Sequence, residues 1–338
     1  MLYNYVVTDS KTQPLRYVTI KEQGSRMYIG IDIGGTKCAV VKGTVIDDRI
    51  KIESKVKFPT PDKDEALSRI FSEVERLMPC NAIGISCGGP LDEERGVIMS
   101  PPNLPGWDNV PITELLTERF GVPAYLLNDA NACAVAEWKF GAGRGAENMV
   151  FLTFGTGMGA GLILNGRLYS GCCGMAGEIG HIRLSHDGPE GYGKVGSFEG
   201  FCSGGGIARW AKIIRNQAKA GERVAFSSIC EVSDDELDAK KIAELARLGD
   251  PDARELFKSC GRRLGEGLAI IADILNPERV VIGSIYQRCE DLLCEGIAET
   301  LSEEALGACS SAMTVLPAEL KEEIGDVAAI SVALRDYK

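Results

Sequence analysis

The sequence has little of what several large functional classes require. It contains only two histidines, His181 and His186, which limits any metal site built on imidazole ligands. The most apolar stretch, around 268–275, is short and holds Asp273, whereas a membrane span needs about 20 apolar residues. The N-terminus has no charged segment followed by an apolar one, so no signal peptide is predicted. We therefore expect a cytoplasmic protein without a membrane segment.

The sequence also has no run of lysines and arginines. Lys and Arg number 37 against 48 Asp and Glu, giving a formal net charge of −11. A nucleic acid would meet net repulsion from such a chain, so we expect no nucleic-acid partner. A small phosphate ligand is still allowed, because a few backbone amides of a glycine loop can bind it against the overall charge.

The remaining composition is that of a globular protein. The chain has 338 residues, 45% apolar and 25% charged, which is enough for two domains or one large one. Its 12 cysteines are scattered from Cys38 to Cys309 without a compact framework. Because no export signal is present, we interpret them as reduced thiols that mostly act as small buried hydrophobes.

The pattern divides the chain into an N-terminal extension and a long α/β region. Residues 1–26 contain two β-prone runs around Pro14, which predict a hairpin and are too short for a helix-turn-helix domain. From Met27 the pattern predicts strand, glycine turn, strand and a third strand, then helices over 64–78 and 112–120 and a helix from Asp129. After Gly204 the chain is mostly helical, including 260–275, and a last helix covers 328–334.

The strand–turn–strand unit occurs twice. Sliding 149–166 back by 121 residues places Thr153 on Asp32, Gly155 on Gly34 and Gly157 on Thr36. The matched turns and their apolar flanks favour a two-lobed protein built from duplicated halves, although a chance match is the alternative.

Both turns have the composition of phosphate-binding loops. Adjacent or alternating glycines let backbone N–H groups approach an anion closely, and threonine and lysine add donors. Asp32, at a strand end, is suited to hold Mg²⁺ through water. The alternative is a pair of plain hairpin turns. The candidate phosphate-binding residues are Asp32, Gly34, Gly35, Thr36, Lys37, Gly155, Thr156 and Gly157.

Two other glycine patterns do not predict nucleotide loops. Residues 188–194 fit G-x-x-x-x-G-K, but Val195 replaces the Ser or Thr of a Walker loop and no clear strand precedes it. Residues 30–35 lack the G-x-G-x-x-G spacing of a dinucleotide-binding turn.

Polar residues elsewhere are suited to a substrate with hydroxyl groups. Asp129 opens a helix after a strand, where it could accept a proton from an attacking hydroxyl or serve only as a helix cap. Glu178 and His181 are three residues apart in a glycine-rich stretch and can bracket adjacent sugar hydroxyls, with Asn103 and Glu199 as further partners. Each of these residues, considered by itself, would be interpreted as an ordinary core or surface group.

The ordered motifs DIGGTK, CGGP, NLPGW, NDANA, FGTGMGAG and GEIGH resemble those of the ROK family, sugar kinases and sugar-responsive repressors of the actin and hexokinase superfamily. The resemblance runs from about Met27 to the C-terminus. It implies a two-lobed, ribonuclease H-like α/β fold with an active-site cleft between the lobes. The smaller lobe would comprise 27–127 and about 324–338, and the larger one 128–323.

The resemblance also implies ligands and roles. The cofactors would be ATP and Mg²⁺, the partners a sugar and ATP, and the assembly a homodimer or homotetramer. Asp129 matches the catalytic base, and the adenosine-side turn matches Gly283 and Ser284. The residues that match sugar-binding positions are Asn103, Asn128, Glu178, His181 and Glu199.

One segment departs from the family. Its members usually carry a structural zinc site in a Cys-x-Cys-Gly-x-x-Gly-Cys-Leu-Glu run that works with the histidine of GEIGH. Here residues 190–199 keep Gly193, Gly196 and Glu199 but none of the three cysteines. A closed zinc site needs four Cys or His ligands, so we expect no zinc and a His181 that is free to bind sugar.

These observations predict a cytoplasmic ATP-dependent hexose kinase that phosphorylates the 6-hydroxyl of glucose or a related hexose. N-acetylmannosamine, N-acetylglucosamine and fructose are the alternative substrates. The alternative of another class is a sugar-binding regulator without turnover, whether a transcription factor or a catalytically weak sensor.

Overall fold

The computed structural model describes residues 26–47, 49–220, 228–335 and 337. The predicted hairpin within residues 1–26 therefore lies almost entirely outside the described residues. None of the helices in the described ranges combines the length and apolar composition of a bilayer span.

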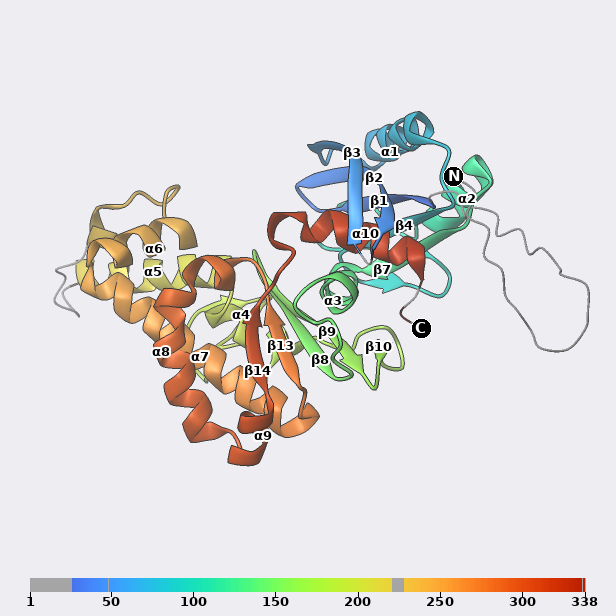
Figure 1. Cartoon of the computed structure of the whole chain (residues 1–338). Coiled ribbons are helices and arrows are strands. Elements are labelled where there is room, and N and C mark those ends of the chain that lie inside the picture. Colours follow the sequence, from blue (N-terminus) through green and yellow to red (C-terminus); the bar gives the residue numbers. More distant parts are fainter. Residues whose placement is uncertain (1–25, 48, 221–227, 336, 338) are drawn as a thin grey trace, which may run out of the picture.

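The first lobe is built on a five-stranded sheet in the order β3-β2-β1-β4-β7 (Figure 1). The strands β1, β2 and β3 are antiparallel neighbours, whereas β4 is parallel to β1 and β7 is parallel to β4. The helices α1 and α2 cover one face, and α10 covers the other. The elements are β1 (Met27–Ile33), β2 (Lys37–Ile46), β3 (Arg49–Pro59), α1 (Lys63–Leu77), β4 (Ala82–Cys87), β5 (Leu91–Asp92), β6 (Val97–Ile98), α2 (Ile112–Phe120), β7 (Ala124–Asn128), η3 (Lys321–Glu323) and α10 (Ile324–Leu334).

The second lobe repeats this arrangement with the order β10-β9-β8-β13-β14. Its hairpin and parallel pairs follow the same pattern, and helices α4 to α8 pack against the sheet in a large core. The elements are α3 (Asp129–Phe140), β8 (Met149–Phe154), β9 (Met158–Leu164), β10 (Arg167–Tyr169), η1 (Ile179–His181), β11 (Glu190–Gly191), β12 (Lys194–Val195), α4 (Phe198–Phe201), α5 (Gly204–Lys219), η2 (Ser228–Glu231), α6 (Ala239–Leu248), α7 (Pro251–Leu275), β13 (Arg279–Ile282), α8 (Ile285–Glu304), α9 (Gly307–Ala312) and β14 (Thr314–Pro317).

The two sheets support the duplication predicted from the sequence. The offset of 121 residues places Ile33, the end of β1, on Phe154, the end of β8, and Lys37, the start of β2, on Met158, the start of β9. The shared strand order extends the similarity beyond the two turns to both halves of the fold.

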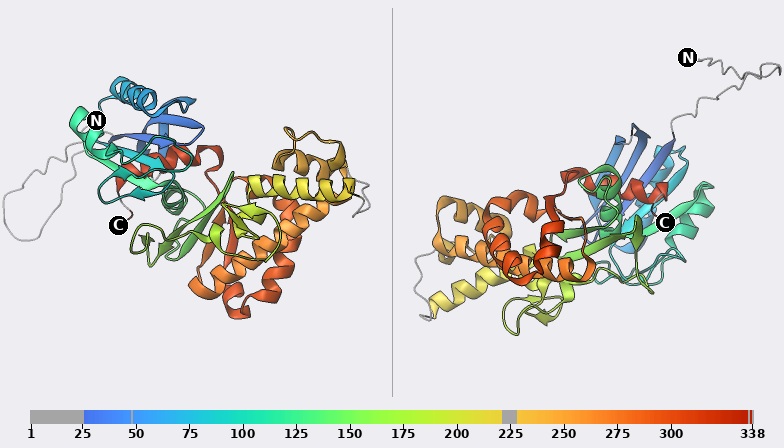
Figure 2. Two further views of the ribbon diagram at one scale, coloured as in Figure 1. Left: turned by 180° about the vertical axis from the view of Figure 1, so that it is seen from behind. Right: turned by 60° about the horizontal axis from the view of Figure 1, so that its bottom comes forward.

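Two helices lie between the sheets and connect the lobes (Figures 1 and 2). α3 follows β7 of the first sheet but packs on β8 and β9, whereas α10 follows β14 of the second sheet but packs on β1 and β4. They also pack against each other, so each half contributes a helix to the other. The division into a lobe of 27–127 with about 324–338 and a lobe of 128–323 stays a prediction, which this packing supports.

The close approach of α10 requires glycine in the first sheet. A Cβ atom on Gly84 would lie 2.1 Å from the carbonyl oxygen of Ala329, and one on Gly30 would lie 2.8 Å from the Ala329 Cβ. Because no real Cβ tolerates such distances, these two glycines allow the helix to lie directly on the strands.

Some predicted boundaries were wrong. The helix predicted over 260–275 begins nine residues earlier, at Pro251, because Asp250 caps it and proline suits its first turn. The last helix begins at Ile324 rather than at 328. All 12 cysteines are unpaired, as expected, but five are fully buried and three are exposed, so the buried class is smaller than predicted.

Candidate active site

The first glycine turn joins β1 and β2 at the end of the first sheet. Gly34 N–H donates to the Lys37 carbonyl over 3.1 Å, and the Thr60 hydroxyl donates to the Gly34 carbonyl over 2.6 Å. A Cβ on Gly35 would lie 2.6 Å from the carbonyl oxygen of Asn103. The fold therefore brings the turn into contact with the predicted Asn103 loop, and only glycine permits that contact.

Asp32 lies at the base of this turn among other charged groups. The pKa of Asp32 is raised to about 7, mainly by burial and then by the nearby negative charges of Asp129 and Asp326, although Lys57 and Lys55 lower it. Lys55 Nζ also forms an ion pair with Asp326 Oδ2 at 2.5 Å. The sequence pattern singled out neither Asp326 nor the two lysines.

The carboxylates around Asp32 fit a divalent cation. Mutual repulsion between Asp32 and Asp129 is what a bound cation would relieve. In the described part of the chain no three His, Cys, Asp or Glu side chains come together closely enough to hold a metal ion by themselves. Mg²⁺ is usually held by one or two carboxylates together with water and substrate phosphates, so Asp32 is the residue here that could hold it.

The end of β7 places Asn128 and Asp129 side by side at the start of α3. Asn128 is the helix cap, because its Oδ1 accepts the N–H groups of Ala130 at 3.0 Å and Asn131 at 3.3 Å. The alternative that Asp129 is only the N-cap is therefore wrong. With Oδ1 engaged, the Nδ2 amide of Asn128 is the group left for a ligand, and a Cβ on Gly89 would lie 3.6 Å from it.

Asp129 presents one carboxylate oxygen toward an open space. Its Oδ1 accepts the Ala130 N–H at 2.8 Å, whereas its Oδ2 faces Gly88, where a Cβ would still be 3.8 Å away. The side chain is exposed to solvent, yet the dense protein around it raises the pKa of Asp129 above its ordinary value. Such a group is suited to receive a proton from a ligand hydroxyl beside Gly88.

The second glycine turn, between β8 and β9, holds Glu199. Glu199 extends from α4, and its Oε2 accepts the Met158 N–H at 3.0 Å. A Cβ on Gly157 would lie 2.8 Å from the same oxygen, so glycine at 157 lets the carboxylate approach the turn. One oxygen of Glu199 is thereby fixed, and the other is left for a ligand.

Glu178 and His181 lie on the loop that crosses the start of β9. The loop is held by a hydrogen bond from Ala160 N–H to the Gly177 carbonyl at 2.9 Å. Burial raises the pKa of Glu178, and the charge of Asp129 raises it further, whereas His181 lowers it. These interactions place Glu178 near both Asp129 and His181.

The second turn also lies against the start of α5 and against the predicted adenosine-side turn at Ser284. Gly204 N–H, at the start of α5, donates to the Gly155 carbonyl at 2.8 Å. A Cβ on Gly155 would lie 3.7 Å from the Ser284 hydroxyl oxygen. Residues 204–206 were predicted only as the start of a helix, although three consecutive glycines between a serine and an apolar residue are a signal for close backbone approach.

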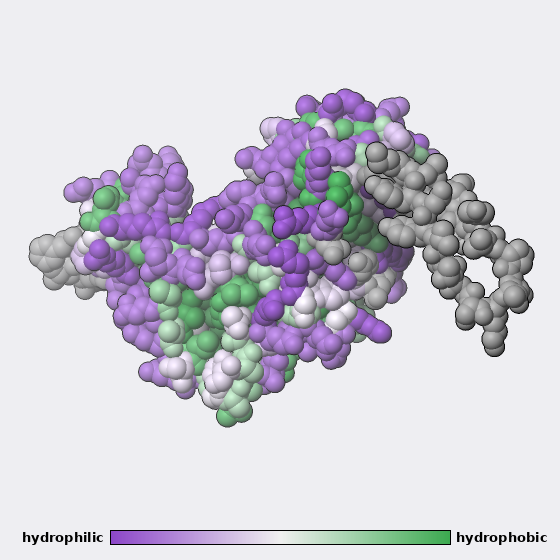
Figure 3. Space-filling model, viewed as in Figure 1, coloured by the Kyte–Doolittle hydropathy of each residue, from purple (hydrophilic) through white to green (hydrophobic). Residues whose placement is uncertain are grey.

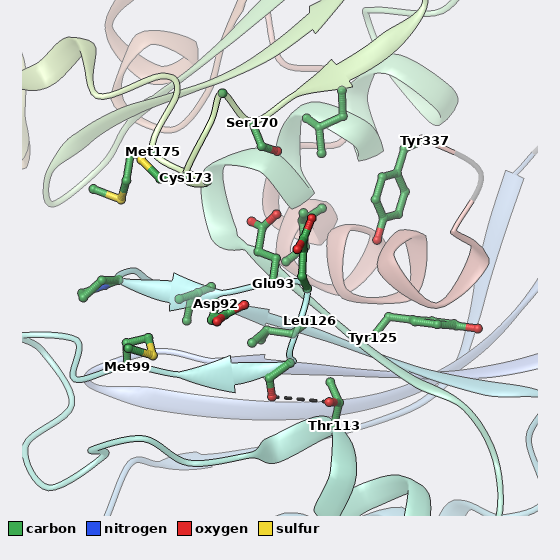
Figure 4. A pocket seen from close by; sticks show the side chains of 18 of the residues that line it. Asp92, Glu93, Met99, Thr113, Tyr125, Leu126, Ser170, Cys173, Met175 and Tyr337 are labelled. Carbon is green, nitrogen blue, oxygen red and sulfur yellow. Dashed lines mark hydrogen bonds between the residues drawn. The ribbon is translucent and has the colours of Figure 1, made fainter.

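A large cavity of about 930 Å³ lies at the edge of β7. Figure 4 shows Asp92 and Glu93 on one side and Cys173 on the loop opposite. Neither Asp129 nor Glu178 lines it, so it is not the predicted sugar site. Glu93 Oε1 accepts the Asn128 N–H at 3.0 Å, so this cavity wall supports the residue that caps α3. Glu93 was not among the residues predicted from the sequence.

Several predicted site residues lie at strand ends, namely Asp32 at the end of β1 and Asn128 at the end of β7, whereas Glu199 lies on α4 and Glu178 on the loop before η1. Figure 3 shows the surface hollowed at the gap between the lobes and largely hydrophilic around it. The Asn103 loop and the first turn come from the first lobe, and the second turn, Glu178, His181 and Glu199 come from the second.

Comparisons with known proteins find relatives over nearly the whole chain. The ROK family profile matches residues 28–335. The chain is 34% identical over 313 residues to a glucokinase of Streptomyces coelicolor, covering 91% of this chain and 97% of that one. It is 26% identical over 333 residues to a xylose repressor of Caldicellulosiruptor bescii, covering 96% of this chain and 82% of that one.

Solved structures share the fold. A ROK family glucokinase from Streptomyces griseus, in complex with glucose and AMPPNP, has a TM-score of 0.74 at 32% identity, covering 91% of this chain and 99% of that one. A ROK hexokinase from Thermus thermophilus has a TM-score of 0.72 at 31% identity, covering 92% and 98%. The fold is the two-lobed actin and hexokinase-like fold, and the chain belongs to the ROK family.

Proposed function

We propose that the protein is an ATP-dependent hexose kinase that transfers the γ-phosphoryl group to the 6-hydroxyl of glucose or a closely related hexose. The observation that carries this proposal is the carboxylate of Asp129. Its Oδ1 is fixed by the α3 backbone, its Oδ2 is open beside Gly88, and its charge interacts with both Asp32 and Glu178. A group at the meeting point of a phosphate side and a sugar side is suited to phosphoryl transfer.

Asp129 acts on the attacking hydroxyl. Its open Oδ2 accepts the hydrogen bond of the 6-hydroxyl and receives the proton as the oxygen attacks phosphorus. Because transition states of phosphoryl transfer are loose, much of the contribution of Asp129 lies in orienting the hydroxyl in line with the leaving group. The raised pKa makes the carboxylate a better proton acceptor than an ordinary surface aspartate.

The other predicted residues hold the two substrates. The Nδ2 of Asn128 donates to the sugar, and the free oxygen of Glu199 and the carboxylate of Glu178 accept from sugar hydroxyls. The backbone N–H groups of the two glycine turns bind phosphate oxygens. When bound near Asp32, Mg²⁺ would neutralise charge that develops on the phosphates.

The relatives support a kinase more than a sensor. The glucokinases named above are more similar in sequence than the xylose repressor, and the chain spans nearly all of their length. Because the chain also resembles a repressor, a sugar-binding regulator is the alternative function, and the experiment below distinguishes the two. Among kinase substrates, N-acetylmannosamine, N-acetylglucosamine and fructose compete with glucose, because an acetamido group needs only room beside Glu178 and His181.

The test is coupled ADP release with Mg·ATP over glucose, mannose, fructose and the two N-acetylhexosamines, followed by calorimetric binding of each sugar. We expect one sugar to give turnover far above the others. Turnover with none of them, by a folded protein that still binds a sugar, would replace the kinase by a sensor. Highest turnover with an N-acetylhexosamine would keep the kinase and correct its substrate.

The pKa of Asp32 predicts a pH dependence of Mg·ATP binding. A carboxyl with a pKa of about 7 is mostly protonated below that pH, and a cation requires the ionised form. We therefore expect the affinity for Mg·ATP to be constant above pH 8 and to fall toward about tenfold per pH unit below pH 6.

Calorimetry between pH 5.5 and 8.5 measures this, with Asp32→Asn as the reference. Protonation of the nucleotide phosphates affects the measurements on both proteins equally, so it cancels in the ratio of their Mg·ATP affinities. Asp129→Asn should move the decline to lower pH, since it removes a negative neighbour that raises the pKa of Asp32. A ratio that does not vary with pH would contradict the assignment.

A further inference from the structure

The short hairpin formed by β11 and β12 carries an unusual residue at its tip. Glu190 pairs with Val195 and Gly191 with Lys194, which leaves Tyr192 as the first of two turn residues. Its φ is 45°, and that of the following glycine is 72°. This is the two-residue turn with both φ values positive, in which asparagine, aspartate and glycine are preferred and a bulky residue is strained.

The side chain of Tyr192 contacts the sugar-site histidine rather than the core. The ring centroids of Tyr192 and His181 are 6.3 Å apart with an interplanar angle of 77°, an edge-to-face contact. Tyr192 is 73% exposed, so burial of its ring does not explain its place at a strained position.

The second strand of the hairpin holds the main chain of the same histidine. Lys194 Nζ donates to the carbonyl oxygen of His181 at 2.7 Å. Tyr192 thus contacts the His181 ring and Lys194 its backbone, although both are more than ten residues further along the chain.

The base of the hairpin is fixed to the helix that carries Glu199. Ser197 Oγ donates to the Gly191 carbonyl at 3.2 Å and accepts the Gly200 N–H at 3.1 Å, which caps α4. Arg183 Nη1 donates to the Val195 carbonyl at 2.7 Å. The hairpin, His181 and Glu199 therefore form one hydrogen-bonded unit.

This unit does not fit the zinc site usual in the family. The three cysteine positions are occupied by Glu190, Tyr192 and Ser197. The Ser197 hydroxyl is engaged in the two hydrogen bonds above, and the Tyr192 ring is turned to His181. Only His181 and Glu190 are left with side chains of a type that binds zinc, fewer than a closed site needs.

We propose that Tyr192 and Lys194 are positioning residues that orient His181 toward the sugar without a metal ion. The inference rests on the proposed sugar kinase, because it assigns His181 to a sugar hydroxyl. In this arrangement the edge-to-face contact with Tyr192 selects the ring orientation of His181. The hydrogen bond from Lys194 fixes the main chain of His181, from which the ring extends.

The first test separates positioning from general structure by kinetics. Tyr192→Ala should raise the KM for the sugar roughly three- to tenfold, while the KM for ATP stays constant, because only the sugar contact of His181 is loosened. Tyr192→Phe keeps the ring and should restore most of the affinity. Tyr169→Ala, an exposed tyrosine outside the hairpin, is the matched control. Unchanged sugar KM in Tyr192→Ala would overturn the proposal.

The second test reads the histidine directly. With two histidines in the chain, His186→Gln leaves the imidazole NMR signals of His181 alone in the spectrum. Tyr192→Ala in that background should shift these signals, because the neighbouring ring current is lost, and should weaken their response to added sugar. Signals that do not move would overturn the proposal even if no sugar is turned over, so its failure is distinct from failure of the kinase.

The third test concerns the metal. A zinc-selective chelator in excess Mg²⁺ should leave the calorimetric sugar affinity of the wild type unchanged, and metal analysis should find well under one zinc per chain. The triple variant Glu190→Cys, Tyr192→Cys and Ser197→Cys should acquire zinc and become sensitive to the chelator. One zinc per wild-type chain, with sugar affinity lost on chelation, would show that a metal and not the hairpin orients His181.

Discussion

Replacing Asp129 by asparagine should lower kcat by roughly 10²- to 10⁴-fold while the protein stays folded and still binds sugar. The amide keeps the shape of the side chain and can still accept the Ala130 N–H through its oxygen. It cannot receive a proton at the position of Oδ2, so the loss should fall on turnover rather than on the KM for the sugar.

The stability of this variant gives an independent check. The charge of Asp129 raises the pKa values of Asp32 and Glu178, which means that these carboxylates repel one another in the folded state. Removing one charge should leave the midpoint of thermal unfolding unchanged or higher. A folding defect, by contrast, would lower kcat and the midpoint together.

A matched control is Asp64→Asn, which makes the same change in the first turn of α1, where the carboxylate is solvent-exposed and pairs with Lys63. It should leave kcat within about twofold, because a surface ion pair contributes little to the stability of the folded protein. If Asp129→Asn kept more than a tenth of the wild-type kcat, Asp129 would not be the base.

The second large effect concerns folding stability. Glu137, in the last turn of α3, is fully buried. Its Oε2 accepts the N–H groups of Ala142 at 2.8 Å and Glu319 at 3.1 Å, and its Oε1 accepts that of Leu320 at 2.9 Å. Residues 319 and 320 belong to the segment by which the chain returns from β14 to α10, so this carboxylate ties both crossings between the lobes together.

Glu137→Gln should reduce the free energy of unfolding by roughly 2–4 kcal/mol, measured as a shift of the urea midpoint. The amide has one acceptor oxygen, so its NH₂ group must face at least one buried N–H donor that then has no partner. Glu319→Gln is the control, because Glu319 is about half exposed and pairs with Arg144 at the surface. That pair should be worth at most about 1 kcal/mol. Equal shifts of the urea midpoint for the two variants would contradict the role of Glu137 in joining α3 to the segment before α10.

The extent of prediction from sequence differs between the fold and the site. The strand–turn–strand units could be predicted because apolar alternation and glycine turns are local, and the duplication followed because both copies kept them. The start of α7 was missed although Asp250 and Pro251 are local signals. The reason is that the first half of α7 is less apolar than residues 260–275, over which the helix was predicted.

At the site, the candidate residues were found as separate motifs, and their roles stay predictions. Which of two adjacent polar residues caps α3 was not predictable, because Asn128 and Asp129 are both good caps and only the backbone angles at the end of β7 select Asn128. Asp326 could not be associated with Asp32, because nearly 300 residues separate them and a helix that crosses between lobes brings them together.

Residue types and short spacings were enough to predict the α/β character, the two glycine turns, the resemblance to the ROK family and the absence of the three cysteines. Three features became visible only in the folded chain: which oxygen of Asp129 is open, which groups raise the pKa of Asp32 and what the residues at the missing cysteine positions contact. These depend on direction and distance between segments far apart in the chain. The contact of Tyr192 with His181 is one such case, since a tyrosine in a glycine-rich loop has no local pattern that names its partner.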